Sequence, residues 1–102
     1  MSIKPRVILE TDLHNDCGLI AAAAWKYLTS HGVKAKILRY GYGKNKGHRL
    51  VIFESGCSLA AYDHQGTRTI YRATWETPPK AFAKAIMDAE RDKRKVTMAK
   101  WE

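Results

Sequence analysis

The first hydrophobic pattern along the chain is that of a helix. The residues from Cys17 to Leu28 are almost all apolar and include four consecutive alanines, the residue type with the highest helix propensity. Asn15 or Asp16 can cap the first turn through a side-chain oxygen, and Gly32 can end the helix in a left-handed conformation. Because the helix is apolar on most of its sides, we expect it at the centre of the fold.

After Gly32 the pattern changes to alternation, which predicts strands. Apolar residues alternate with lysines over residues 33–37, and this strand should continue to about Tyr42. A glycine-flanked loop over residues 43–47 follows it, and a separate β-prone run at 6–9 predicts an edge strand or a lead-in. Three further β-prone runs, separated by short turns, cover residues 48–54, 57–63 and 67–73.

The last pattern is helical again. Thr77 is the expected N-cap of this helix and Pro78 its first residue. An apolar stripe at helical spacing should face the core, and it consists of Phe82, Ala85, Ile86 and Ala89. Residues 90–102 are expected to form the basic end of this helix. The order of elements predicts an α+β fold, in which a central N-terminal helix packs on an antiparallel β-meander of about four strands and a C-terminal helix follows.

The composition is that of one globular domain. With 102 residues, 45% of them hydrophobic and 27% charged, residues 1–102 are expected to fold as a single domain. The 18 Lys and Arg residues exceed the 10 Asp and Glu residues and give a net charge of +8, which favours an acidic partner without identifying it. No apolar run approaches the roughly 20 residues of a membrane span, so no membrane partner is expected.

The two cysteines are expected to be reduced thiols. The first ten residues lack the pattern of a secretory signal, which predicts a cytoplasmic location and argues against a Cys17–Cys57 disulfide. Cys57 lies close to Leu59 in an expected strand and is interpreted as a packed core thiol. Cys17 comes directly after the expected cap, where unpaired N–H groups and the helix dipole favour the thiolate, which is the nucleophilic form.

His48 and Asp63 are the expected partners of this thiol. A hairpin that turns at Ser55-Gly56 would place them directly opposite each other on one face, with Cβ atoms roughly 5 Å apart. A carboxylate in that position can orient the imidazole, whose other nitrogen can then accept the proton of a thiol. A register slip of one residue would move the two side chains to opposite faces.

The order and spacing of these residues resemble a known family. Cys17, His48 and Asp63 follow one another at separations of 31 and 15 residues, with Gly41-Tyr42 at the end of the intervening strand. This arrangement, with a cysteine heading a helix and the other two on strands, resembles the transglutaminase-like branch of the papain-like cysteine proteases. The resemblance implies a papain-like core and a cysteine hydrolase or acyl transferase acting on an amide or peptide bond.

The resemblance also implies roles for the residues. Cys17 would attack the carbonyl, His48 would act as base and then acid, and Asp63 would orient His48. Asn15 or the backbone N–H of Cys17 is the candidate donor to the oxyanion. No metal or organic cofactor is expected. A set of basic residues should line the rim of the cleft and attract a protein or peptide substrate, an acidic one included: Lys44, Lys46 and Arg49.

Two other functions fit parts of the sequence. Basic residues interleaved with Tyr40 and Tyr42 are typical of a module that binds nucleic acid or an acidic protein, and such a module could be a catalytically silent relative of the family. A zinc site is the other alternative, since the chain contains His14, Cys17, His48, Cys57 and His64. Only His14 and Cys17 have ligand-like spacing and no second pair follows, so we expect no metal.

Overall fold

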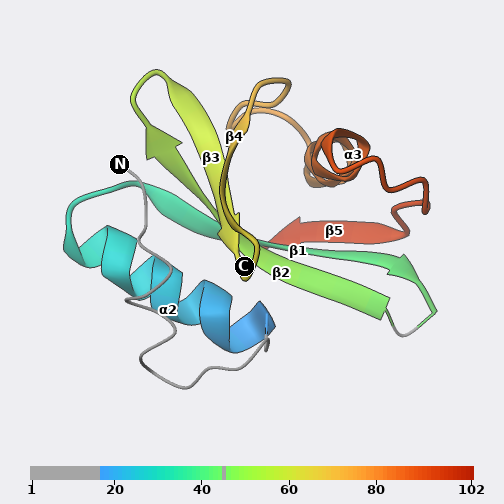
Figure 1. Cartoon of the computed structure of the whole chain (residues 1–102), viewed down its shortest axis with the longest axis horizontal. Helices are drawn as coiled ribbons and strands as arrows, with labels where there is room; N and C mark the ends of the chain where they lie inside the picture. Colours follow the sequence, from blue (N-terminus) through green and yellow to red (C-terminus); the bar gives the residue numbers. More distant parts are fainter. Residues whose placement is uncertain (1–16, 45) are drawn as a thin grey trace.

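The computed structural model describes residues 17–44 and 46–102 and has an α+β architecture (Figure 1). Within these residues five strands form one antiparallel sheet in the order β4-β3-β2-β1-β5. Along the chain the elements are α2 (Cys17–Ser30), β1 (Ala35–Gly43), β2 (Lys46–Ser55), β3 (Ser58–Asp63), β4 (Gly66–Ile70), α3 (Pro79–Ala89) and β5 (Met98–Trp101). The predicted fold class, with an N-terminal helix, a β-meander and a C-terminal helix, is confirmed. The predicted strand at 6–9 and the candidate caps Asn15 and Asp16 lie outside the described residues.

The first helix ends as its sequence predicts. Gly32 has a φ of +76°, a left-handed conformation that side chains other than glycine rarely adopt. The backbone N–H groups of His31 and Val33 both donate to the carbonyl of Leu28, at 3.1 and 3.0 Å. These bonds satisfy a carbonyl of the last turn and lead the chain directly into β1.

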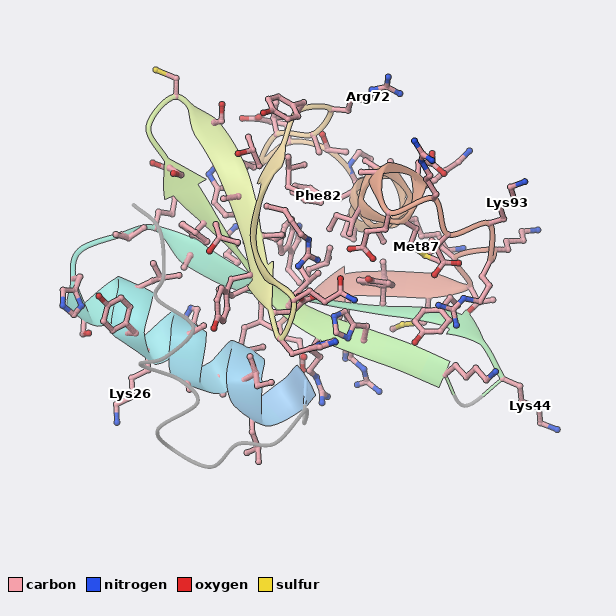
Figure 2. The ribbon with its side chains drawn as sticks, in the orientation of Figure 1. Lys26, Lys44, Arg72, Phe82, Met87 and Lys93 are labelled. Atoms are coloured by element: carbon pink, nitrogen blue, oxygen red, sulfur yellow. The ribbon has the colours of Figure 1, made fainter. Side chains whose placement is uncertain are left out.

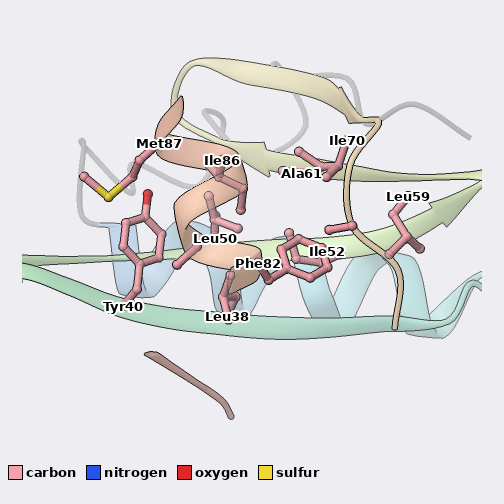
Figure 3. Packing of buried hydrophobic residues seen from close by; sticks show 12 residues of the cluster. Leu38, Tyr40, Leu50, Ile52, Leu59, Ala61, Ile70, Phe82, Ile86 and Met87 are labelled. Atoms are coloured by element: carbon pink, nitrogen blue, oxygen red, sulfur yellow. The ribbon is translucent and has the colours of Figure 1, made fainter. Parts of the chain in front are cut away.

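Helices α2 and α3 cover opposite faces of the sheet (Figure 1). On one face Ile20, Ala24 and Leu28 of α2 pack with Val51 and Phe53 of β2. The other face forms a second cluster with α3, shown in Figure 3, which includes Leu38, Leu50, Ile52, Phe82 and Ile86. Consecutive residues of β2 and β3 therefore belong to different clusters, and the sheet lies between α2 and α3.

The fifth strand differs from the sequence prediction. Residues 90–102 were expected to continue the last helix, but α3 ends at Ala89 and β5 pairs with β1. Arg91, directly after the C-cap Glu90, has a φ of +58°, a left-handed conformation that does not continue a helix. Ala99 and Trp101 then pack against the α3 cluster while Met98 and Lys100 are exposed, so burial of two alternate side chains stabilises a strand at this edge.

Two smaller predictions were also wrong. The N-cap of α3 is Pro78 rather than Thr77, and it makes no side-chain capping bond; the Thr77 hydroxyl instead accepts a hydrogen bond from the backbone N–H of Thr74. Cys57 is exposed in the turn between β2 and β3 and is not a packed core thiol. Among residues 17–44 and 46–102, no helix has the length and apolar character needed to cross a membrane.

Candidate functional site

The structure brings His48 and Asp63 together, as the sequence predicted. Nε2 of His48 lies 2.8 Å from Oδ2 of Asp63. Both side chains project from the α3 face, because His48 alternates in phase with Leu50 and Ile52, and Asp63 with Ala61. His48 is mostly buried and Asp63 is almost completely so, with 3% of its side chain exposed. The pair lies near the start of β2 and the end of β3.

The register that produces this contact differs from the predicted one. The hairpin turns at Gly56-Cys57, where Gly56 has a φ of +62°, and its ladder runs from Ser55–Ser58 to Val51–Tyr62. The predicted placement of His48 directly opposite Asp63 was therefore wrong. The true register is shifted by two residues, which preserves the face of every side chain and leaves His48 diagonal to Asp63.

Asp63 is held as a carboxylate by a network of donors. The guanidinium of Arg68 binds it through both terminal nitrogens, at 2.5 Å to Oδ1 and 3.0 Å to Oδ2, and the backbone N–H of Gln65 lies 2.9 Å from Oδ1. Burial alone would raise the pKa of Asp63, but the hydrogen bonds from His48, Arg68 and Gln65 outweigh it and hold this pKa well below its usual range. Asp63 is therefore ionised at neutral pH.

This charge determines which nitrogen of His48 carries the proton in the neutral ring. A carboxylate can only accept hydrogen bonds, so Nε2 of His48 must be the protonated nitrogen that donates to Asp63. Nδ1 is then the nitrogen with a lone pair available to a proton donor. The arrangement can therefore supply a general base whose tautomer is fixed by a buried acid.

Arg68 and Glu90 are site residues that the sequence reasoning missed. Arg68 also donates to Oε1 of Glu90, at 2.8 Å, and thereby links the end of α3 to Asp63. A signal for Arg68 exists in the sequence: a hairpin turn at His64-Gln65 places it opposite Ala61, on the same face as Asp63. Glu90 gives no such signal, because its contact depends on how α3 packs on the sheet.

Four rings form a row across this corner of the sheet. The ring centroids of Tyr42 and Tyr40 are 6.1 Å apart, those of Tyr40 and His48 are 5.8 Å apart, and those of His48 and His64 are 6.0 Å apart. Burial, together with the negative charges of Glu90 and Asp63, raises the pKa of Tyr40, so its phenol stays neutral. The row connects β1 to the turn after β3.

One set of residues in the described part of the chain has the composition of a metal site. His48, Asp63 and the exposed His64 offer ligand atoms that all lie within 4.8 Å of one another. However, Oδ1 and Oδ2 of Asp63 already accept hydrogen bonds from the Arg68 guanidinium, whose positive charge would repel a divalent cation. The geometry therefore favours the histidine–carboxylate pair over a metal centre.

The position of Cys17 relative to this pair is the critical part of the predicted triad. The backbone of Cys17 begins α2, as predicted, but its side chain and the whole of Asn15 lie outside the described residues. α2 covers the face of the sheet opposite to His48 and Asp63. Its N-terminal end points toward the half of the sheet where β2 begins and β3 ends (Figure 1). His48 lies beyond the last pair of the β2–β3 ladder, which is Val51–Tyr62.

The three basic residues predicted to line the cleft do not all lie on the same face of the sheet. Lys44 and Lys46 are exposed in and beside the β1–β2 turn, and Lys46 alternates in phase with His48. Arg49 lies on the opposite face from His48, and its Nε donates to Oε1 of Glu102 at 2.5 Å. Of the three residues, only the two lysines therefore remain candidates for a rim around His48.

Comparison with protein-family models, with curated proteins and with solved structures finds no match for this chain.

Proposed function

We propose that the protein is a cysteine hydrolase or acyl transferase that acts on an amide or peptide bond. The observation that carries the proposal is the bond between Nε2 of His48 and a buried, ionised Asp63, which orients Nδ1 as a base. A histidine without a chemical role would not need a buried carboxylate to fix its ring. Cys17, at the start of α2, is the proposed nucleophile, as in the transglutaminase-like proteases that the sequence resembles.

The proposed chemistry needs the thiol of Cys17 to reach Nδ1 of His48. Nδ1 would take the thiol proton, the thiolate would attack the carbonyl carbon, and the imidazolium would return the proton to the leaving amine. Water or an amine would then attack the thioester and release the acyl group. Asp63 would keep the ring in one tautomer and stabilise the imidazolium in both steps.

A reactivity experiment tests this proposal without knowledge of the substrate. Iodoacetamide should alkylate Cys17 faster than the exposed Cys57 at about pH 6.5, because only Cys17 has a base and a helix N-terminus to favour its thiolate. Peptide mass spectrometry measures both rates in one sample, so Cys57 is an internal reference. The His48→Gln substitution should lower the rate of Cys17 alkylation by about tenfold or more and leave the rate for Cys57 unchanged.

The matched control is His31→Gln, because His31 is exposed at the far end of α2. It should change neither rate. Equal alkylation of the two thiols, or a Cys17 rate that does not respond to His48→Gln, would show that the thiol and the imidazole do not act together.

A second function is favoured by the position of α2. The sheet lies between α2 and the His48–Asp63 pair, an arrangement that also suits a catalytically silent relative that binds an acidic partner. In that protein Cys17→Ser would preserve biological activity and substitution of the exposed lysines would remove it. If the protein is a hydrolase, Cys17→Ser should instead abolish its biological activity.

A further inference from the structure

The segment that follows α3 carries a group of exposed cations. Arg91, Lys93, Arg94 and Lys95 are all exposed in the connection between α3 and β5. The backbone N–H of Thr97 donates to the carbonyl of Gly41 at 2.8 Å, which attaches this connection to the end of β1. The cations therefore lie at the same end of the molecule as the β1–β2 turn, and Figure 2 shows Lys93 and Lys44 on that side.

A cavity lies between this segment and α3. Its volume is about 520 Å³, and Met87 and Val96 contribute to its apolar lining. Two carboxylates, Asp88 and Asp92, also line it. The cations that line it are Lys80, Lys84, Lys93, Arg94 and Lys95. Five cations against two carboxylates leave an excess of three positive charges. We call this cavity and its five cations the basic groove.

Contacts on two sides fix one cation of the basic groove in place. The guanidinium carbon of Arg94 lies 3.9 Å from the centre of the Tyr42 ring, and Nε and Nη2 of Arg94 both donate to the carboxylate of Asp92. A guanidinium that is held in this way loses less side-chain entropy when it binds a ligand. The groove is therefore partly organised before any partner arrives.

The basic groove is connected to the His48 site. Tyr42, which contacts Arg94, is the first ring of the row that leads through Tyr40 to His48. Met87 belongs both to the groove lining and to the cluster that contains Tyr40. A chain bound in the groove could thus extend along the β1–β2 end of the sheet toward His48.

We infer that the basic groove binds an acidic segment of a polypeptide and, resting on the proposed function, that this segment belongs to the substrate. The charge excess favours an anionic partner. Binding of single-stranded nucleic acid usually needs aromatic rings on which bases can stack. At this surface Arg94 covers the Tyr42 ring, and Tyr40 is 3% exposed. Carboxylate side chains need only the cations and the cavity.

Fluorescence anisotropy tests this inference on the full chain carrying Cys17→Ser, which makes binding independent of thiol chemistry. The probes are a fluorescein-labelled glutamate-rich peptide, a glutamine-rich peptide of equal length, and a single-stranded RNA of equal charge. The glutamate-rich peptide should bind more tightly than both of the others. Its affinity should fall as salt rises above about 0.1 M, because exposed charges are screened over about 10 Å there.

A pair of charge-matched variants locates the binding surface. Lys93→Gln with Lys95→Gln should weaken binding of the glutamate-rich peptide by about fivefold, because two exposed ion pairs are lost. Lys26→Gln with Arg72→Gln removes the same charge from exposed positions outside the groove lining and should change affinity less than twofold. Figure 2 shows the positions of Lys26 and Arg72.

Three results would overturn the inference. They are tighter binding of the RNA, equal binding of the glutamine-rich peptide, and an equal loss of affinity in the two double variants. Each leaves the reactivity of Cys17 untouched, so the groove and the thiol chemistry can fail separately. If the alkylation of Cys17 does not depend on His48 but the glutamate-rich peptide still binds, the proposed hydrolase function is rejected and the groove remains a binding surface.

Discussion

The two faces of the sheet differ in what they bury. The α2 face holds apolar side chains and Tyr62, and Ala21 and Ala24 allow the helix to approach the strands closely. The α3 face is equally apolar at its centre but ends in Asp63, the one buried polar or charged side chain among the described residues. Alternation along β2 and β3 separates the two sets, so one face stabilises the fold while the other also carries the ionic network.

The largest expected effect tests whether the faces are independent. Phe53 on the α2 face and Phe82 on the α3 face are both fully buried. Substitution of either by Ala should lower the free energy of unfolding by about 3–5 kcal/mol in a urea titration. Only Phe82→Ala should also shift the imidazole NMR signals of His48. The reason is that α3 is followed by Glu90, which is paired with Arg68 in the network that holds His48. An equal shift in Phe53→Ala would show that the sheet transmits changes between its faces.

An intermediate effect is expected at Asp63. Asp63→Asn removes the charge that Arg68 and His48 bind, and it should lower the free energy of unfolding at neutral pH by about 1–3 kcal/mol. Because the pKa of Asp63 is lower in the folded than in the unfolded protein, its stabilisation is present above an unfolded pKa of about 3.9 and is lost as the pH falls below that value. The difference between the two proteins should therefore shrink on acidification.

The matched control for this substitution is Asp88→Asn, since Asp88 is exposed on α3. Urea titrations at several pH values should give curves for this variant that parallel those of the unmodified protein. If the loss caused by Asp63→Asn were constant with pH, the carboxylate would not be the stabilised form.

The smallest expected effect concerns the outer end of the network. Glu90 and Arg68 are both partly exposed, at 33% and 26%, and solvent screens their ion pair. Glu90→Gln should cost about 0.5 kcal/mol or less, and high salt should remove the difference. Glu102→Gln, which breaks the ion pair with Arg49 on the other side of the sheet, provides the comparison. A cost at Glu90 as large as that of Asp63→Asn would mean that α3 determines the position of Arg68.

Periodicity in the sequence predicted the helices, the meander and the meeting of His48 with Asp63. It could do so because alternate residues of a strand point to the same face of the sheet, and a register shift of two positions leaves that alternation intact. Strand β5 was not predicted because it is only four residues long and its burial depends on contacts with α3 and β1. The ion pair of Arg68 with Glu90 depends on contacts between distant segments, which local pattern does not encode.

Arg68 also has a consequence for the solubility of the protein. Among the strands that the structure describes, β4 lies at one edge of the sheet, and an edge strand can expose backbone groups that pair with another molecule and start aggregation. Arg68 projects from the middle of this short strand toward the interior, where an incoming strand would have to bury or displace its charge. The residue that binds Asp63 therefore also protects this edge against extension by a second copy of the chain.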